Sequence, residues 1–295
     1  MPAPVVHPHY HADSGTWSYV VADAQARIAA IIDPVLDFDG KSARTGTAFA
    51  QKLLDCVVAN GYRVRWILET HAHADHLTAA PFLKNALHRR DAAAPAPMIA
   101  IGQGIRDVQA SFKSIFNLEP DFATDGSQFD HLFADDEPFD IGGIACRVVA
   151  TPGHTSDSIS YRIGDSVFVG DSLLMPDSGT ARCDFPGGDA ALLYASIRRL
   201  YALPEQTRVF VCHDYGPNGR EPRCETSIGE QEDRNIHVRD GVSEHDYVAM
   251  RQARDATLPV PTLMLPAVQV NIRAGELPPT EDDGNRYLKI PIDRL

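Results

Sequence analysis

Two apolar runs near the start of the chain, separated by a polar turn, predict a β-hairpin. Residues 16–22 and 28–32 are rich in Val, Ile and Ala, and Asp23–Arg27 lies between them. Residues 44–60 then carry apolar side chains at helical spacing, and Gly61 follows where a helix C-cap is common. The first part of the chain therefore predicts two strands followed by a helix.

Strands and helices continue to alternate through the middle of the chain. Helices are expected from about residue 77 with Pro81 in the first turn, at 104–116, and at 189–202 with Asp189 as N-cap. Further strands are expected at 64–68, 98–101, 146–150, 158–163, 166–169 and 208–212. The remainder is richer in charge and proline and less regular. We therefore expect a catalytic domain over residues 1–220 and an extension packed on it over 221–295.

The composition is that of a globular protein with an acidic balance. Of 295 residues, 44% are hydrophobic, and 27 Lys and Arg against 40 Asp and Glu give a net charge of −13. This charge argues against a nucleic-acid partner and against an anionic membrane surface. No run approaches the roughly 20 apolar residues of a membrane span. The N-terminus shows neither a signal nor a transit pattern, so we expect a cytoplasmic protein.

The cysteines and two polar clusters carry little functional information. Five widely spaced cysteines without a CxxC pair argue against a disulfide framework and a zinc–thiolate site, so we expect most of them to be buried apolar residues. His7, His9 and His11 lie on a proline-containing terminus, and we expect them to be frayed and solvated. Glu230–Asp233 is interpreted as a solvated face.

Histidines and aspartates gather just after four of the predicted strands. His71, His73, Asp75 and His76 follow the strand at 64–68, and the others follow one strand each: His154, Asp171 and His213. Open α/β sheets collect their ligands at the carboxyl ends of strands, so four strands direct polar groups to one place. Imidazole and carboxylate together suit zinc, manganese or iron. The sequence therefore predicts a metal site.

Four motifs in order identify a superfamily. THAHADH at 70–76, TPGHTSDS at 151–158, GDSLL at 170–174 and CHDYG at 212–216 resemble the metallo-β-lactamase superfamily. The resemblance implies a four-layer αβ/βα sandwich of two mixed sheets, with the metal at the edge between them. Within the superfamily the chain is most similar to the persulfide dioxygenases, the group with the ethylmalonic encephalopathy protein and bacterial sulfur dioxygenases. This similarity extends to IIDPVLDFD at 31–39 and GTARCDFPGGDAALLYASI at 179–197.

The resemblance implies roles for individual residues. It makes His71, His154 and Asp171 the ligands of one iron(II) per chain, two histidines and one carboxylate that leave positions open for oxygen and substrate. The remaining four groups would orient these ligands and hold waters: His73, Asp75, His76 and His213. All seven residues that a two-metal hydrolase of the superfamily uses are present, so the sequence alone leaves the metal count open.

On the substrate side, the resemblance points to Arg182 and Tyr215 as contacts for glutathione persulfide. A guanidinium fork suits the carboxylates of glutathione. Asp184 is expected to organise the loop of Arg182, and Cys183 is treated as a bystander. Arg220 or Arg223 could add a carboxylate contact. The family implies a homodimer as well.

The first functional hypothesis is an iron-dependent persulfide dioxygenase that converts glutathione persulfide, O2 and water to sulfite and glutathione. The alternative is a thioester hydrolase similar to glyoxalase II, in which two metals generate hydroxide. Glyoxalase II usually carries a lysine-rich glutathione site in a helical C-terminal domain, and here only Lys289 follows position 113. The intact ligand set argues against a noncatalytic member, and the acidic charge argues against a nucleic-acid-processing one.

Overall fold

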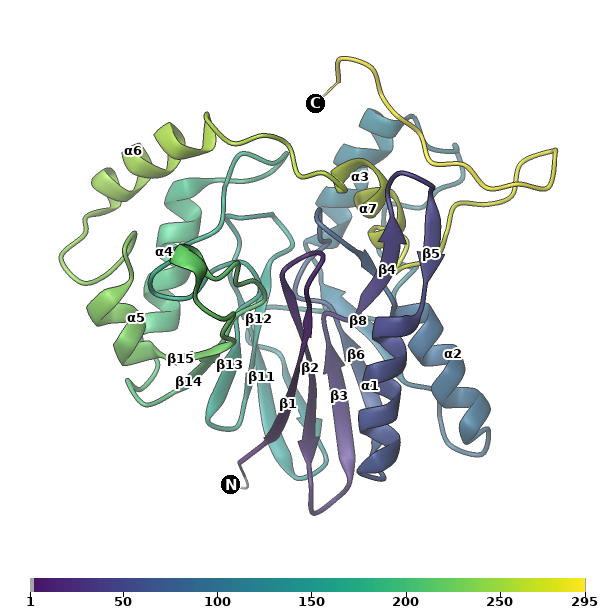
Figure 1. The fold of residues 1–295 in the computed structure, drawn as a ribbon, viewed down its shortest axis with the longest axis horizontal. Helices are drawn as coiled ribbons and strands as arrows, with labels where there is room; N and C mark the ends of the chain where they lie inside the picture. The colour runs from purple at the N-terminus through teal and green to yellow at the C-terminus, as the bar shows by residue number, and fades with distance from the viewer. Residues whose placement is uncertain (1–2, 295) are drawn as a thin grey trace.

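The computed structural model describes residues 3–294 as two six-stranded sheets stacked face to face (Figure 1). The first sheet has the order β1-β2-β3-β6-β8-β9. Its strands are β1 Val5–His11, β2 Thr16–Asp23, β3 Ile28–Ile32, β6 Arg63–Leu68, β8 Met98–Gly102 and β9 His131–Phe133. The first three strands run antiparallel, and β3, β6, β8 and β9 run parallel. The sheet is therefore mixed, as expected.

The second sheet has the order β10-β11-β12-β13-β14-β15. Its strands are β10 Pro138–Ile141, β11 Ile144–Ala150, β12 Ile159–Ile163, β13 Ser166–Phe168, β14 Arg208–Phe210 and β15 Glu225–Ser227. Only β13 and β14 pair in parallel; the other neighbours are antiparallel. A small third sheet joins β5 Arg44–Gly46, β4 Val35–Asp39 and β7 Leu77–Thr78.

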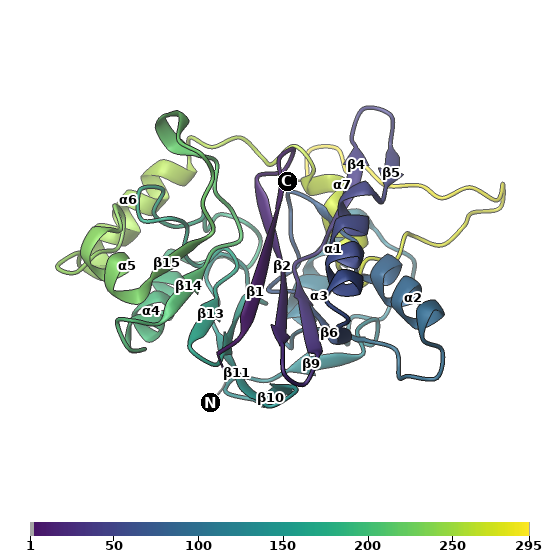
Figure 2. The same ribbon diagram turned by 60° about the horizontal axis from the view of Figure 1, so that its bottom comes forward.

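Helices cover the outer face of each sheet (Figure 2). The first sheet is covered by α1 Ala48–Ala59, α2 Ala80–Arg90 and α3 Ile105–Phe116. The second is covered by α4 Ala190–Tyr201, α5 Ile228–Arg234 and α6 Glu244–Asp255. The last helix, α7 Met264–Asn271, lies beside β7, and Pro217–Gly219 form one 3-10 turn, η1. Asp189 caps α4 by accepting a hydrogen bond from the backbone of Leu192, as expected.

Three layers of buried apolar side chains correspond to this arrangement. The layer between the sheets includes Tyr19 and Ile32 from the first sheet and Tyr161, Phe168 and Phe210 from the second. One further layer lies between each sheet and its helices. The fold is therefore the four-layer αβ/βα sandwich that the resemblance implied. Within residues 3–294, no helix has both the length and the apolar character needed to cross a bilayer.

The expectation that the N-terminal histidines are frayed and solvated is wrong. The segment with His7, His9 and His11 is an edge strand, β1, and not a frayed terminus: it pairs with β2 along its length, and an edge position tolerates Pro8. His7 Nε2 lies 3.2 Å from the hydroxyl of Tyr62. All three histidines are half-buried.

The C-terminal segment is more regular than expected, because α5, α6 and α7 lie within residues 221–295. Val268 and Ile272 join the apolar layer under the first sheet. In α5, Gln231 is buried, and its side-chain amide donates a hydrogen bond to the carbonyl of Leu174. The interpretation of Glu230–Asp233 as a solvated face is therefore wrong at Gln231.

Candidate metal centre

The seven predicted metal-site residues come together at one edge of the sandwich. His71, His73, Asp75 and His76 lie in the loop between β6 of the first sheet and α2. The other three follow strands of the second sheet: His154 after β11, Asp171 after β13 and His213 after β14. The two sheets therefore both contribute to the site, and the strand-end argument located the region correctly.

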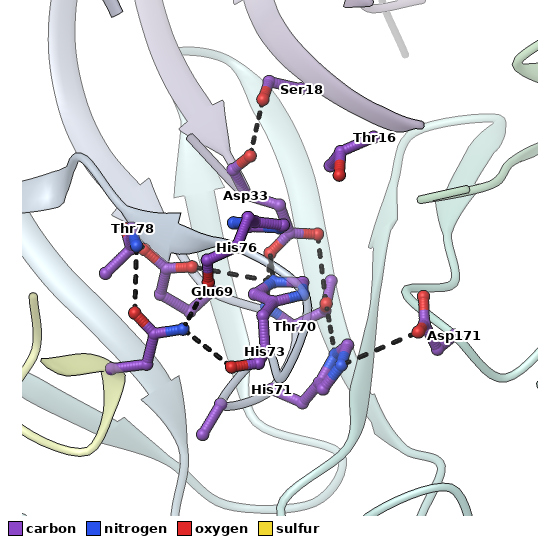
Figure 3. A network of polar contacts seen from close by, with 12 residues as sticks. Thr16, Ser18, Asp33, Glu69, Thr70, His71, His73, His76, Thr78 and Asp171 are labelled. Carbon is purple, nitrogen blue, oxygen red and sulfur yellow. Dashed lines mark hydrogen bonds and ion pairs between the residues drawn. The ribbon is translucent and has the colours of Figure 1, made fainter. Parts of the chain in front are cut away.

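A first set of ligand atoms is formed by His71, His154 and Asp171. One ligand atom from each lies within 4.8 Å of the other two. Asp171 Oδ2 is 3.9 Å from His71 Nε2 and 3.5 Å from His154 Nε2, and Figure 3 shows the facing pair His71 and Asp171. Two imidazoles and one carboxylate thus converge on a common point.

Hydrogen bonds fix which nitrogen each ring of the first set presents. His154 Nδ1 donates to the carbonyl oxygen of Arg182 at 2.6 Å. Thr70 Oγ1 lies 3.0 Å from Asp33 Oδ2 and 3.0 Å from His71 Nδ1. The Thr70 hydroxyl donates its single hydrogen to Asp33, so His71 Nδ1 donates to Thr70. Both rings therefore present the lone pair of Nε2 toward Asp171.

A second set of ligand atoms lies directly beside the first. It consists of His73, Asp75, His76 and His213, whose ligand atoms are also within 4.8 Å of one another. Asp171 lies between the two sets, because its Oδ1 is 3.4 Å from His213 Nε2 while its Oδ2 faces the first set. The carboxylate of Asp171 is thus placed to serve either set.

Buried atoms without partners show that the two sets fit a metal. Within residues 3–294 the following buried atoms have no hydrogen-bond partner: His71 Nε2, His73 Nδ1, His76 Nε2, Asp171 Oδ1 and His213 Nε2. An unpaired buried polar atom costs about 1–3 kcal/mol, so five of them in one place need an explanation. Imidazole nitrogen and carboxylate oxygen are ligands for zinc, manganese and iron, and both sets offer them.

Two buried carboxylates that the motifs did not single out surround His73. Its Nε2 lies 3.1 Å from Asp33 Oδ1 and 3.8 Å from Glu69 Oε2, as Figure 3 shows. Burial lowers the pKa of His73, but Asp33, Asp75 and Glu69 outweigh it and raise the pKa to about 10. Burial and Asp33 raise the pKa of Glu69 to about 8. Asp33 directly follows β3, so the strand-end rule that identified His71 could have found it.

Cys212 is a third residue that the sequence argument missed. Its Sγ lies within 4.8 Å of ligand atoms of Asp171 and His213, and also of Asp33 and His73. It immediately precedes His213 but was treated as one of the apolar cysteines. Burial, followed by Asp33 and Asp171, holds the pKa of its thiol well above the ordinary range, so the thiol stays protonated.

The two predicted substrate contacts occupy different environments. The guanidinium of Arg182 donates to both oxygens of Asp184 at 2.5 and 2.6 Å, and to the carbonyl of Pro259 at 2.6 Å. Asp184 therefore organises this loop by holding the arginine. Tyr215 is 66% exposed and lies against His213. Tyr215 therefore lies beside the metal-site residue His213, whereas the guanidinium of Arg182 is hydrogen-bonded to Asp184 in its own loop.

The lesser candidates are also engaged within the chain. Arg220 forms ion pairs with Asp177 and the buried Asp214, whereas Arg223 is exposed and 3.6 Å from Asp177. Cys183 is buried, and burial followed by Asp255 raises the pKa of its thiol to about 12. The five cysteines are all free, in agreement with the absence of a disulfide framework in the sequence argument.

A cavity of about 1800 Å³ opens next to the second set. Asp75, His76 and Tyr215 line one end of it, and the β4–β5 hairpin and the chain from Pro261 to Ile290 line the rest. Four cationic residues also line it: Lys41, Arg44, Arg286 and Lys289. The residues that line the cavity include Asp75 and His76 of the second set and Tyr215, but neither Arg182 nor any residue of the first set.

Comparisons with known proteins agree with the fold. A "Probable metallo-hydrolase" of Burkholderia pseudomallei is 50% identical over 95% of this chain and 96% of its own length. "Glyoxylase B2" of Dictyostelium discoideum is 49% identical over 96% of this chain and 95% of its own. The bovine mitochondrial persulfide dioxygenase ETHE1 is 28% identical over 90% of this chain and 87% of its own.

The solved structure of ETHE1 from Myxococcus xanthus is 30% identical, with a TM-score of 0.70 over 92% of this chain and all of that chain. Residues 11–213 match the sequence family described as the metallo-beta-lactamase superfamily, a range that includes all seven metal-site candidates. The chain therefore belongs to the metallo-β-lactamase superfamily.

Proposed function

We propose that this chain is an iron-dependent persulfide dioxygenase that acts on glutathione persulfide. The observation that carries the proposal is the first ligand set, in which His71, His154 and Asp171 converge with both Nε2 atoms directed at the carboxylate. Two histidines and one carboxylate with open positions are the ligand set of many iron(II) oxygenases. An iron(II) ion held there would supply the redox chemistry of the reaction.

The overall reaction balances as glutathione persulfide, O2 and water giving glutathione, sulfite and two protons. The residues of the chain have three tasks in it. Thr70 and the Arg182 carbonyl keep the two ligand rings in the required tautomer. Tyr215, exposed at the edge of the site, is placed to contact the substrate. Asp75 and His213, 3.4 Å apart, are placed to hold water or a proton beside the first set.

The similarity to ETHE1 supports this proposal over most of both chains, at 30% identity to the solved structure. So does the segment at 179–197, which resembles the persulfide dioxygenases and lies outside the seven metal-site residues. The relatives that are 49–50% identical bear the names metallo-hydrolase and glyoxylase, and by identity these names favour the second candidate below.

That second candidate is a thioester hydrolase of the glyoxalase II type. Its support in the structure is the second ligand set, which has its own unpartnered atoms at His76 Nε2 and His213 Nε2, with Asp171 between the two sets. Two metals, one held by each set, would lower the pKa of a bound water and polarise a thioester carbonyl. Against it, Lys289 is the only lysine after position 113, and its ammonium already donates to the carbonyl of Asn117.

One experiment separates the two reactions. The protein is purified without added metal, its iron, zinc and manganese are counted by mass spectrometry, and the same sample is assayed twice. We expect about one iron per chain and O2 uptake with glutathione persulfide. Two metals per chain together with hydrolysis of S-lactoylglutathione would overturn the dioxygenase proposal in favour of the hydrolase.

The control for the substrate is plain glutathione, which has the same carboxylates but no terminal sulfur. We expect no O2 uptake with it. Equal uptake with both thiols would show that the terminal sulfur is not the reacting group. His71→Ala serves as the matched protein control, because it removes one nitrogen of the first set and should abolish both iron and O2 uptake.

A further inference from the structure

A buried asparagine in the last helix contacts the loop that carries four of the metal-site residues. The side-chain amide of Asn271, in α7, donates to the carbonyls of His73 and His76, each at 2.8 Å. Its oxygen accepts from the backbone N–H of Thr78 at 2.9 Å. Asn271 is 4% exposed, and all three of its contacts fall on the turn between β6 and α2. This one side chain therefore holds the backbone of the loop that carries His73, Asp75 and His76 of the second set.

A buried ion pair in α6 contacts the loop at 180–183, whose Arg182 carbonyl is the hydrogen-bond partner of His154. Arg251 donates to Asp255 within the helix, and its Nη1 also donates to the carbonyl of Thr180 at 3.0 Å. Asp255 Oδ2 accepts from the backbone N–H of Cys183 at 2.9 Å. Ala181 and Arg182 lie between these two contacts, and the carbonyl of Arg182 accepts from His154 Nδ1. The ion pair thus holds the peptide that orients a ligand ring.

We propose that Asn271 and the pair Arg251–Asp255 are positioning residues of the metal centre, each acting on one of its two halves. None of them touches the metal ligand atoms themselves. They act through backbone carbonyls and N–H groups of the loops, in the manner of outer hydrogen-bond partners of a metal site. The inference rests on the proposed function insofar as that function requires a metal at these loops.

The two contacts come from separate parts of the molecule. Figure 1 shows α6 beside α4 over the second sheet, and α7 near β4 on the side of the first. In the loop at 73–78 and in the loop at 180–183, these backbone groups are satisfied by side chains that come 71 or more positions later in the chain. Without the C-terminal helices, buried N–H and carbonyl groups next to the metal would be left unpaired.

The test uses variants chosen to remove the contacts while the protein still folds. Asn271→Asp keeps the size of the side chain but loses both N–H donors, and Asn271→Leu loses all three contacts. For the ion pair, a single change would leave a buried charge unpaired, so Arg251→Met and Asp255→Leu are combined, since a well-packed apolar replacement of a whole buried pair is tolerated best.

The matched control is Arg273→Met. Arg273 is also a largely buried arginine, two residues after Asn271, and its guanidinium pairs with Glu119 and lies over Phe122. Through these contacts Arg273 touches neither the loop at 73–78 nor the loop at 180–183. This control reports what the loss of a buried C-terminal ion pair does to stability alone.

Co²⁺ is the probe, titrated into metal-free full-length protein and followed by its visible absorption, with a competing chelator for the affinity. We expect the Asn271 variants and the double variant to bind the first Co²⁺ about 10- to 100-fold more weakly than wild type, with an altered spectrum, because outer partners typically contribute that much. Arg273→Met should keep the wild-type affinity and spectrum.

Variants that fold and bind Co²⁺ with the affinity and spectrum of wild type would overturn this inference while leaving the proposed function intact. Equal weakening in Arg273→Met would also overturn it, since a general loss of stability would then explain the effect. A wild-type protein that bound no metal would overturn the proposed function and this inference together.

Discussion

The phenol ring of Tyr215 lies parallel to the imidazole of His213, with an angle of 1° between the rings and 5.9 Å between their centres. Gly15 packs closely against Tyr215, because a Cβ at position 15 would lie 2.6 Å from the ring of Tyr215. Tyr215 therefore has a defined place at the edge of the second ligand set while most of its surface faces solvent. It can cover His213 and still meet a substrate.

The first prediction concerns this tyrosine. If its hydroxyl donates to the substrate, Tyr215→Phe removes one hydrogen bond worth about 0.5–1.5 kcal/mol and should raise KM for glutathione persulfide about 2- to 10-fold. Iron content should stay the same. Steady-state O2 uptake measures the effect, and an unchanged KM would show that the hydroxyl makes no contact with the substrate.

The second prediction concerns Arg182, which the resemblance assigns to a glutathione carboxylate. A charge-assisted hydrogen bond contributes about 1.5–3 kcal/mol, so Arg182→Ala should lower kcat/KM about 10- to 100-fold, with Arg182→Lys intermediate. Since Asp184 holds the same guanidinium, Asp184→Asn should keep or raise the affinity. A small persulfide without carboxylates is the control substrate. Equal impairment with it would mean that Arg182 only holds its loop against Pro259.

The third prediction separates ligands from their supports. His154→Ala or Asp171→Ala removes a member of the first set and should empty the iron site. His73→Ala and His213→Ala should retain part of the iron, because losses in the surroundings typically cost 10- to 100-fold in affinity. Metal counting by mass spectrometry decides between the two groups. Complete loss of metal in His73→Ala would favour the two-metal centre instead.

The fourth prediction concerns Gly153, which precedes His154. Its φ is +137°, and a Cβ would lie 2.3 Å from the backbone nitrogen of Leu193 in α4. Gly153→Ala should therefore lower the free energy of unfolding by about 1–3 kcal/mol or more, measured by urea denaturation. Gly241→Ala is the control, since Gly241 also has a positive φ but open space around it. If both variants lost the same free energy of unfolding, backbone strain and not the contact with α4 would explain the effect at Gly153.

The fifth prediction concerns pH. His237 Nδ1 accepts a hydrogen bond from the backbone of Thr180 at 3.0 Å, and burial, with Arg251 and Arg254 nearby, lowers the pKa of His237 to about 4. Between its ordinary value of 6.5 and about 4, the unfolded chain binds more protons at this residue. Stability should therefore fall as the pH drops through this range.

The variant for this test is His237→Asn, which keeps a polar side chain but does not titrate. Its free energy of unfolding should depend less on pH than that of wild type between pH 6.5 and 4, as urea denaturation at several pH values can measure. Parallel curves for the two proteins would show that His237 does not contribute to the acid sensitivity.

The grouping of the seven candidate metal-site residues was predictable, because these residues follow apolar runs of a kind that sequence patterns identify well. His154 and His213 are separated by many residues, yet both lie at carboxyl ends of strands, where a sheet of this class concentrates polar groups. The strand β1 was not predictable in this way. Its histidines stand where a half-buried strand usually has apolar residues, and within residues 3–294 it pairs only with β2.

The role of Asn271 could not be predicted from the sequence at all. A single asparagine within an apolar helix has no local signature, and its partners lie 193 to 198 positions away. The same holds for the orientation of Arg182, whose place beside the metal motifs indicated a substrate contact while its fork is turned to Asp184. Both depend on tertiary contacts that periodicity does not encode.

The contribution of both sheets to the candidate metal centre has a consequence for the whole molecule. His71 belongs to the first half of the sandwich, and His154 and Asp171 to the second, so an ion bound by all three would crosslink the halves. Separation of the sheets would then require release of the ion. An ion present at 100 times its dissociation constant adds about 2.7 kcal/mol to the free energy of unfolding, so the stability of the folded chain would depend on the concentration of free metal.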